Sequence, residues 1–158
     1  VKLMELPDRL YKIVFFSNNH PVTAFEDFIT RRLLPKSGLI LDLGCGTGRY
    51  KHDFDTIIGV DVSMKMCKIS KIHQYDVIQA DGCHLPFQNE TFDGIICHQV
   101  IEHISDHLLF LKEIRRILKH NGVLIISTVR NSKYRKIGRS QGSHKRICVS
   151  EFEKILNE

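Results

Sequence analysis

The chain has 158 residues, 42% hydrophobic and 26% charged, which fits a single globular domain able to bury its own core. No apolar run reaches the roughly 20 residues that cross a bilayer. The chain also does not open with a charged region followed by an apolar stretch, so we expect no secretory signal. Five cysteines without a C-x-x-C pair exclude the usual zinc and redox motifs, so we expect free thiols in a cytoplasmic protein.

The net charge of +5 is concentrated in one segment. Residues 130–146 contain seven lysines and arginines and no acid, whereas the rest of the chain is slightly acidic. Such a segment either binds phosphate groups or is a solvated loop.

The first 36 residues are predicted to form a helical lid. The helical pattern is weak over residues 8–16 and clearer from Pro21 to Leu34, before Pro35 ends it. One face of this second helix would carry the apolar residues Val22, Phe25, Phe28, Ile29 and Leu33.

Residues 38–128 alternate between strand and helix patterns. Apolar runs predict strands at 39–43, 57–60, 77–80, 94–97 and 123–127. Helices are predicted at 64–72, where Ser63 would be the N-cap, and from Ser105 to Lys119. This alternation predicts an α/β fold with a doubly wound, mostly parallel sheet. Residues 129–158 would add a basic loop and, after the capping box Ser150-x-x-Glu153, a last helix to the same single domain, 1–158.

A glycine-rich loop follows the first strand of this core, with the sequence DLGCGTG from Asp42 to Gly48. Ligands of open parallel sheets bind outside the carboxyl ends of the strands, where glycines let a ligand touch bare backbone. The spacing is G-x-G-x-G, not the G-x-G-x-x-G of dinucleotide sites, and the short distance from Gly48 to Ile57 leaves little room for a phosphate-binding helix. Adenosylmethionine, which has no phosphate, fits this loop better.

Two acids end the next two strands. Asp61 follows the strand at 57–60, where its carboxylate can accept hydrogen bonds from both ribose hydroxyls. Asp81, followed by Gly82, ends the strand at 77–80, where it either accepts from the adenine amine or forms an Asx turn.

Four stretches, LILDLGCGTG, IIGVDVS, ADGCHLPFQNETFDGIICHQVIEHI and LKEIRRILKHNGVLIIST, resemble successive motifs of class I S-adenosylmethionine-dependent methyltransferases, in the branch similar to the ubiquinone and menaquinone biosynthesis enzymes. The resemblance implies that Gly44 and Gly46 approach the methionine part, that Asp61 holds the ribose, and that Val62 packs on the adenine. It also implies that Asp81 contacts the adenine amine and that His98 lies near the methionyl end or the transfer point. The full set of expected cofactor-binding residues is Asp42, Gly44, Cys45, Gly46, Gly48, Asp61, Val62, Ala80, Asp81, Gly82 and His98.

The reacting residues are less defined, because methyl transfer mainly needs alignment and a base helps only where the acceptor carries a proton. Candidates are His98, Glu102, His103 and His107, all after the fourth strand; Glu102 and His103 could instead brace the loop. A metal site is not expected, since Gln99 stands where a further carboxylate would be needed.

Three acceptor hypotheses remain open. The first is a small molecule, the second is RNA, held through the basic segment 130–146, and the third is a non-catalytic cofactor-binding subunit. The family's final strand hairpin has no counterpart in the sequence, so the strand at 123–127 is predicted to be an exposed apolar edge. That edge would pair with a second copy, be covered by residues 130–158, or belong to a truncated chain.

Overall fold

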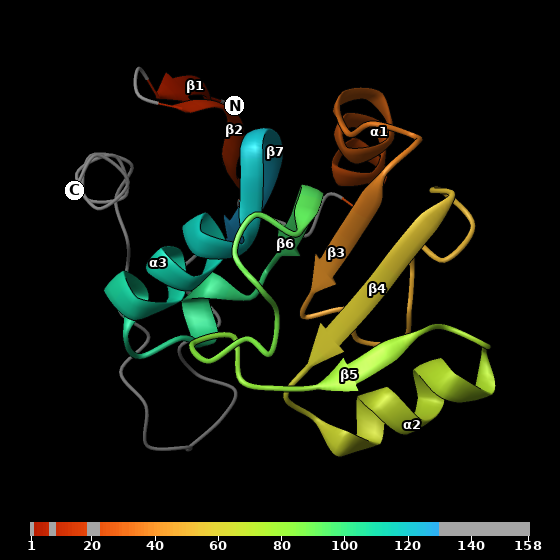
Figure 1. Cartoon of the computed structure of the whole chain (residues 1–158). Helices are drawn as coiled ribbons and strands as arrows, with labels where there is room; N and C mark the ends of the chain where they lie inside the picture. The colour runs from red at the N-terminus through yellow and green to blue at the C-terminus, as the bar shows by residue number, and fades with distance from the viewer. Residues whose placement is uncertain (1, 7–8, 19–22, 130–158) are drawn as a thin grey trace.

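The computed structural model describes residues 2–6, 9–18 and 23–129 of the chain (Figure 1). The basic segment 130–146 and the helix predicted after Ser150 lie outside these residues. None of the helices in the described ranges is long and apolar enough to cross a membrane.

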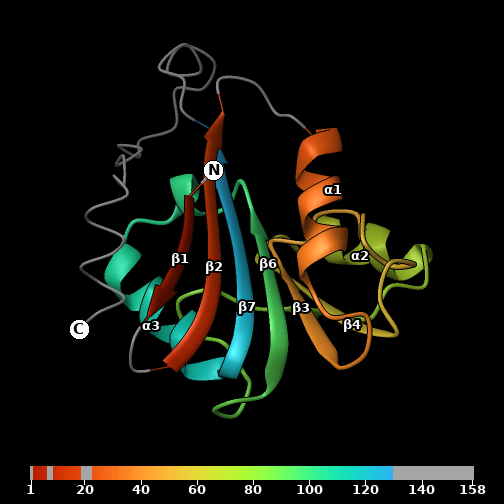
Figure 2. The ribbon, with the colours of Figure 1, turned by 90° about the horizontal axis from the view of Figure 1, so that it is seen from above.

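The described residues form one sheet of seven strands in the order β1-β2-β7-β6-β3-β4-β5. The strands are β1 (Lys2–Leu6), β2 (Arg9–Asn18), β3 (Leu39–Leu43), β4 (Thr56–Asp61), β5 (Val77–Gln79), β6 (Phe92–His98) and β7 (Leu118–Val129). All neighbours are parallel except β1 and β2, and Figure 2 shows the strands from β1 to β4 side by side in this order. The predicted doubly wound, mostly parallel sheet is therefore confirmed.

Helices cover both faces of the sheet. Within the described ranges they are α1 (Thr23–Leu33), α2 (Met64–Ile72) and α3 (His107–Ile117), and a 3-10 turn, η1 (Ile101–His103), follows β6. The predicted cap of α2 is confirmed, because the Ser63 hydroxyl accepts from the Met66 amide at 3.4 Å. The cap of α3 is Asp106 rather than Ser105, since the Asp106 carboxylate accepts from the Leu109 amide at 3.0 Å.

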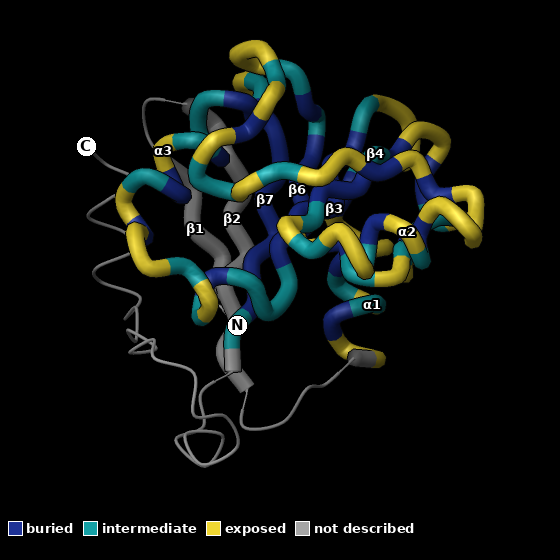
Figure 3. The backbone as a smooth tube through the Cα atoms, turned by 90° about the horizontal axis from the view of Figure 1, so that it is seen from below, coloured by how far each residue is buried: buried dark blue, intermediate teal, exposed yellow. Residues whose placement is uncertain are grey.

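The core lies on the two faces of the central strands, whose side chains alternate between them. On one face, Leu41, Ile95 and Leu124 pack in a cluster that includes the apolar side of α3. On the other face, Ile40, Ile96 and Ile125 pack in a cluster that reaches α2 and the end of α1. Burial on both faces explains why these strands are almost continuously apolar, and Figure 3 shows them as the buried centre of the molecule.

The N-terminal segment corrects two expectations. Residues 2–6 and 9–18 are strands, not the beginning of a helical lid. The stretch RLYKIVFFSN is rich in β-branched and aromatic residues, which favour strands, and pairing with β7 gives β2 a complete partner. Because β2 pairs with β7 from Lys12↔Val123 to Asn18↔Val129, the predicted exposed edge at 123–127 is wrong, and the segment that covers this edge is β2.

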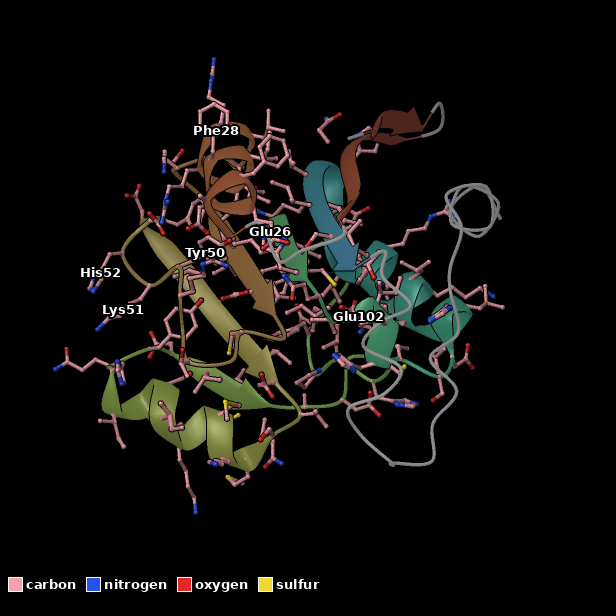
Figure 4. The ribbon with its side chains drawn as sticks, turned by 180° about the vertical axis from the view of Figure 1, so that it is seen from behind. Glu26, Phe28, Tyr50, Lys51, His52 and Glu102 are labelled. Atoms are coloured by element: carbon pink, nitrogen blue, oxygen red, sulfur yellow. The ribbon has the colours of Figure 1, made fainter. Side chains whose placement is uncertain are left out.

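Helix α1 also differs from expectation, because the side that it buries is not its apolar side. Phe25, Phe28 and Leu33 are exposed at 36%, 62% and 40%, whereas Glu26 and Thr30 are buried. Figure 4 shows the Phe28 ring pointing away from the sheet. Periodicity alone predicted an apolar inner side, but the buried positions of α1 meet polar side chains at the ends of β6 and β7.

We expect a proline in β2 to expose the β7 edge. Val14→Pro interrupts a strand that lies between β1 and β7, so the lost hydrogen bond should destabilise the fold by about 1–3 kcal/mol and cause self-association. Leu3→Pro, in the outermost strand β1, is the matched control and should be milder. Thermal unfolding and light scattering measure both effects; a monomeric Val14→Pro variant of unchanged stability would contradict the pairing.

Candidate cofactor and acceptor site

The glycine loop turns from the end of β3 toward β4. The Gly44 and Cys45 amides both donate to the Val60 carbonyl, at 2.7 and 3.0 Å. Gly44 has a φ of +76°, and a Cβ there would clash with Cγ2 of Val100, so a side chain would be strained and would have to displace Val100. Residues 44–55 form turns and bends without a helix, so this crossover offers no helix N-terminus to a pyrophosphate.

Gly46 presents bare backbone to open space. Its φ is +54°, and a Cβ built there would meet nothing within 4 Å. Its amide donates to Oδ2 of Asp61 at 2.9 Å, and its carbonyl accepts from the Ser70 hydroxyl at 2.7 Å. The loop is therefore held firmly at the point where a ligand can approach the chain most closely.

Asp61 joins three elements at the end of β4. One carboxylate oxygen accepts from Gly46 in the loop, and the other accepts from the Ser63 amide at 2.8 Å, just before α2. Each carboxylate oxygen can accept a second hydrogen bond, so the group keeps capacity for a ligand hydroxyl. The next residue, Val62, is 70% exposed and offers an apolar surface beside this acid.

Asp42 and Gly48 lie behind the loop. The Asp42 carboxyl is buried and accepts from the Tyr75 hydroxyl at 3.1 Å; burial raises the pKa of Asp42 to about 7. A Cβ on Gly48 would lie 2.9 Å from the Tyr75 ring. Cys45 is also buried, and burial raises the pKa of its thiol to about 12. These contacts indicate that the residues support the loop from the core.

Residues 80–83 follow β5. The Ala80 amide donates to the Asp61 carbonyl at 3.2 Å, which places this turn beside the end of β4. Asp81 forms the Asx turn, with Oδ1 accepting from the Cys83 amide at 2.9 Å, and its side chain is 60% exposed. Gly82 packs closely on α3, because a Cβ there would lie 2.6 Å from the Phe110 ring. The turn leaves the second oxygen of Asp81 for other donors.

His98 ends β6 and is held at both ring nitrogens. Nδ1 lies 2.9 Å from the Ser127 hydroxyl on β7, and Nε2 lies 2.8 Å from the Thr30 hydroxyl on α1. Burial, followed by the charge of Arg49, lowers the pKa of His98 to about 4, so the ring is neutral at physiological pH.

Glu26 completes this cluster from α1. It is 2% exposed, and Oε1 accepts from the Ser127 hydroxyl at 2.8 Å. The Gln99 amide donates to Oε1 at 3.3 Å, and an Arg49 nitrogen lies 3.8 Å from Oε2. Sequence reasoning missed Glu26, Thr30 and Ser127, because a helix pattern read for apolar periodicity places the two α1 residues on the outer side. The polar interruption at Glu26 and Thr30, one turn apart, was the available signal.

The other candidate bases have structural contacts. Oε2 of Glu102 accepts from the Thr128 hydroxyl at 3.1 Å, which ties η1 to β7. His103 is exposed, and His107 is buried with Nε2 3.1 Å from the Ile101 carbonyl. Over the residues that the structure describes, no group of three or more His, Cys, Asp or Glu side chains could hold a metal ion.

The doubly wound sheet, with a glycine loop directly after β3, places the chain in the class of Rossmann-like α/β proteins, whose ligands bind outside the carboxyl ends of the strands. The chain belongs to the methyltransferase domain family, which matches residues 41–126. The resemblance of its motifs to class I S-adenosylmethionine-dependent methyltransferases is thereby confirmed.

Several relatives are similar over most of the chain. An uncharacterized protein of Methanocaldococcus jannaschii is 36% identical over 115 residues, covering 73% of this chain and 56% of that protein. A demethylmenaquinone methyltransferase of Staphylococcus saprophyticus is 28% identical, covering 75% and 55%. A tRNA (carboxymethyluridine(34)-5-O)-methyltransferase of Arabidopsis thaliana is 32% identical, covering 60% and 24%. The chain spans about half the length of the first of these relatives.

Solved structures share the fold. A SAM-dependent methyltransferase of Thermotoga maritima, described as a possible histamine N-methyltransferase, is 34% identical with a TM-score of 0.58, covering 64% of this chain and 48% of that one. A putative methyltransferase of Bacillus halodurans superposes with a TM-score of 0.70, covering 87% and 67%; at 21% identity it supports the fold alone.

The raised pKa of Asp42 predicts a pH-dependent stability. In the folded state Asp42 keeps its proton up to about pH 7, whereas in the unfolded chain it releases the proton near pH 4. The contribution of Asp42 to the free energy of unfolding is therefore complete below about pH 4 and is lost as the pH rises through about 7. The side-chain amide of the Asp42→Asn variant stays neutral at every pH, so the variant does not lose this stability. Between pH 4 and 8, the free energy of unfolding of Asp42→Asn minus that of the original chain should therefore rise by up to about 4 kcal/mol. Urea unfolding across that range measures the shift. The exposed Asp55→Asn should show none, and parallel curves for Asp42→Asn would contradict the assignment.

Proposed function

We propose that this chain binds S-adenosylmethionine at the ends of β3 and β4 and directs methyl transfer to a small-molecule acceptor. The observation that carries the proposal is Gly46, whose bare Cα faces open space while its amide is fixed by Asp61. Family membership supports the cofactor, and the crossover without a helix disfavours a dinucleotide.

The residues present fit adenosylmethionine. Gly44 and Gly46 would lie along the methionine part, Asp61 would accept from the ribose hydroxyls, and Val62 would pack on the adenine. Asp81, whose Asx turn uses one oxygen, would accept from the adenine amine with the other. Asp42, Cys45, Gly48, Ala80 and Gly82 would shape the site from behind.

When bound, this cofactor supplies an electrophilic methyl group on a sulfonium, which a nucleophile displaces in line. The chain's own task is to align the acceptor and exclude water. His98, at the end of β6, is the candidate base of this chain because its ring is neutral at physiological pH and therefore keeps one basic nitrogen.

The acceptor side favours a small molecule. Helix α1 lies over the ends of β6 and β7, where Thr30 and Ser127 are fully or almost fully buried. Such close cover suits an acceptor that can be enclosed. RNA is the second candidate, because one relative is named as a tRNA methyltransferase and residues 130–146 are strongly basic. A non-catalytic cofactor-binding role is the third.

The two loop glycines separate binding from folding. Gly46→Ala places a methyl group where nothing lies within 4 Å, so it should cost about 1 kcal/mol of stability through its positive φ but weaken adenosylhomocysteine binding at least about tenfold. Gly44→Ala, whose methyl would meet Val100, should instead destabilise the fold. Asp61→Ala should weaken binding by about 1.5–3 kcal/mol. Calorimetry with thermal unfolding distinguishes these effects, and unchanged affinity in both Gly46→Ala and Asp61→Ala would refute the placement.

Product profiling tests the acceptor class. The chain is incubated with cell extract and a methyl-labelled donor, with and without prior RNase treatment. We expect label in small molecules that RNase does not remove, and Asp61→Ala should abolish it. Label confined to RNase-sensitive material would favour the RNA hypothesis.

A further inference from the structure

Four polar side chains, three of them buried and the fourth, His98, partly buried, form a continuous series of hydrogen bonds between α1 and the ends of β6 and β7. Glu26 and Ser127 are 2.8 Å apart, Ser127 and Nδ1 of His98 are 2.9 Å apart, and Nε2 of His98 and Thr30 are 2.8 Å apart. Glu26, Ser127 and Thr30 are each at most 2% exposed. Figure 4 shows Glu26 entering this region from α1.

The direction of each hydrogen bond follows from the number of hydrogens available. The Glu26 carboxylate can only accept, so the single hydroxyl hydrogen of Ser127 points to it. The Ser127 oxygen must then accept from Nδ1 of His98. Because the ring is neutral, Nε2 carries no hydrogen and accepts from the Thr30 hydroxyl. The opposite tautomer would set the Nδ1 lone pair against the Ser127 oxygen at 2.9 Å with no hydrogen between them.

The neighbouring charges leave Glu26 as the anion linked to His98. Asp27, the next residue on α1, accepts from the Tyr50 hydroxyl at 3.0 Å and lies 2.9 Å from an Arg49 nitrogen. The Tyr50 ring is tilted against the His98 ring, with centroids 5.9 Å apart. Asp27 therefore has its own hydrogen-bond and ion-pair partners, and it acts on the His98 ring through its charge, which opposes the lowering of the His98 pKa.

We propose that Glu26, acting through Ser127, is a positioning residue that fixes His98 as the Nδ1–H tautomer, so that the basic Nε2 faces α1, ready for the proton of an acceptor hydroxyl or amine. Thr30 shows that a hydroxyl satisfies Nε2 at this place. This inference rests on the proposed methyl transfer, and it narrows that proposal to acceptors whose oxygen or nitrogen carries a proton.

The proton step balances within these groups. The acceptor's O–H or N–H bond breaks, its proton passes to Nε2, and the electron pair stays on the acceptor atom that forms the new bond to carbon. The imidazolium so formed keeps its Nδ1–H hydrogen bond to Ser127, and the Glu26 charge stabilises it through that hydroxyl. The proton then returns to solvent.

The direct test is the tautomer of His98, read from ¹⁵N-histidine NMR of the full chain at neutral pH, with the His98 signals assigned by their loss in His98→Asn. We expect Nδ1–H in the original chain. In Glu26→Gln the side-chain amide can donate to Ser127, which frees the Ser127 hydrogen for Nδ1, so the population should shift to Nε2–H. Asp27→Asn, the adjacent control, should leave Nδ1–H in place. An Nε2–H ring in the original chain, or an unchanged ring in folded Glu26→Gln, would overturn the proposal.

Ser127→Ala keeps the test decisive if Glu26→Gln fails to fold. It removes the acceptor for Nδ1–H directly, so it should also weaken the preference of His98 for the Nδ1–H tautomer. Kinetics give the second readout: Glu26→Gln should lower kcat by about 100-fold while adenosylhomocysteine affinity changes less than twofold, whereas Asp27→Asn should lower kcat far less. Absence of cofactor binding would refute the proposed function and leave the tautomer result standing, whereas normal binding and turnover in Glu26→Gln would refute the positioning role alone.

Discussion

The loop after β3 and the start of α2, where we propose that the cofactor binds, both depend on the Asp61 carboxylate. It accepts from the Gly46 amide in the loop after β3 and from the Ser63 amide before α2, so one side chain fixes two crossovers at the same edge of the sheet. Parallel strands bring their carboxyl ends to that edge, and only a carboxylate can accept from both amides and retain capacity for a further donor. The open face of Gly46 exists because this bond holds the loop back.

A second carboxylate, Glu26, holds α1 against the ends of β6 and β7, and it explains the unusual orientation of α1. The helix turns a polar surface toward the sheet because His98, Gln99 and Ser127 form hydrogen bonds with α1 or with its Glu26 there, and a buried polar group without a partner would be costly. The exposed Phe25 and Phe28 are the consequence of this orientation. Satisfying the buried polar groups outweighs burying two aromatic rings on a helix that lies at the margin of the core.

The central fold could be predicted from the sequence because its signals are local. The strand at 39–43, the Ser63 cap and the glycine loop each follow from a few adjacent residues, and the structure has β3 and α2 at the predicted bounds. The N-terminal strands could not be predicted in the same way, since a stretch that fits a weak helix becomes a strand when β7 offers a partner some hundred residues away. Likewise, the hydrogen bonds of Glu26 to Ser127 and of Thr30 to His98 join residues far apart in the chain, so the polar positions within α1 could mark Glu26 and Thr30 but not identify their partners.

The central claim is that this edge of the sheet recognises a sulfonium nucleoside and not a dinucleotide. Calorimetric titration of the 158-residue chain with adenosylmethionine and, separately, with NAD⁺ tests it most directly. The account predicts saturable one-to-one binding of adenosylmethionine and no heat from NAD⁺ at the same concentrations. Binding of NAD⁺ with equal or greater affinity would contradict it.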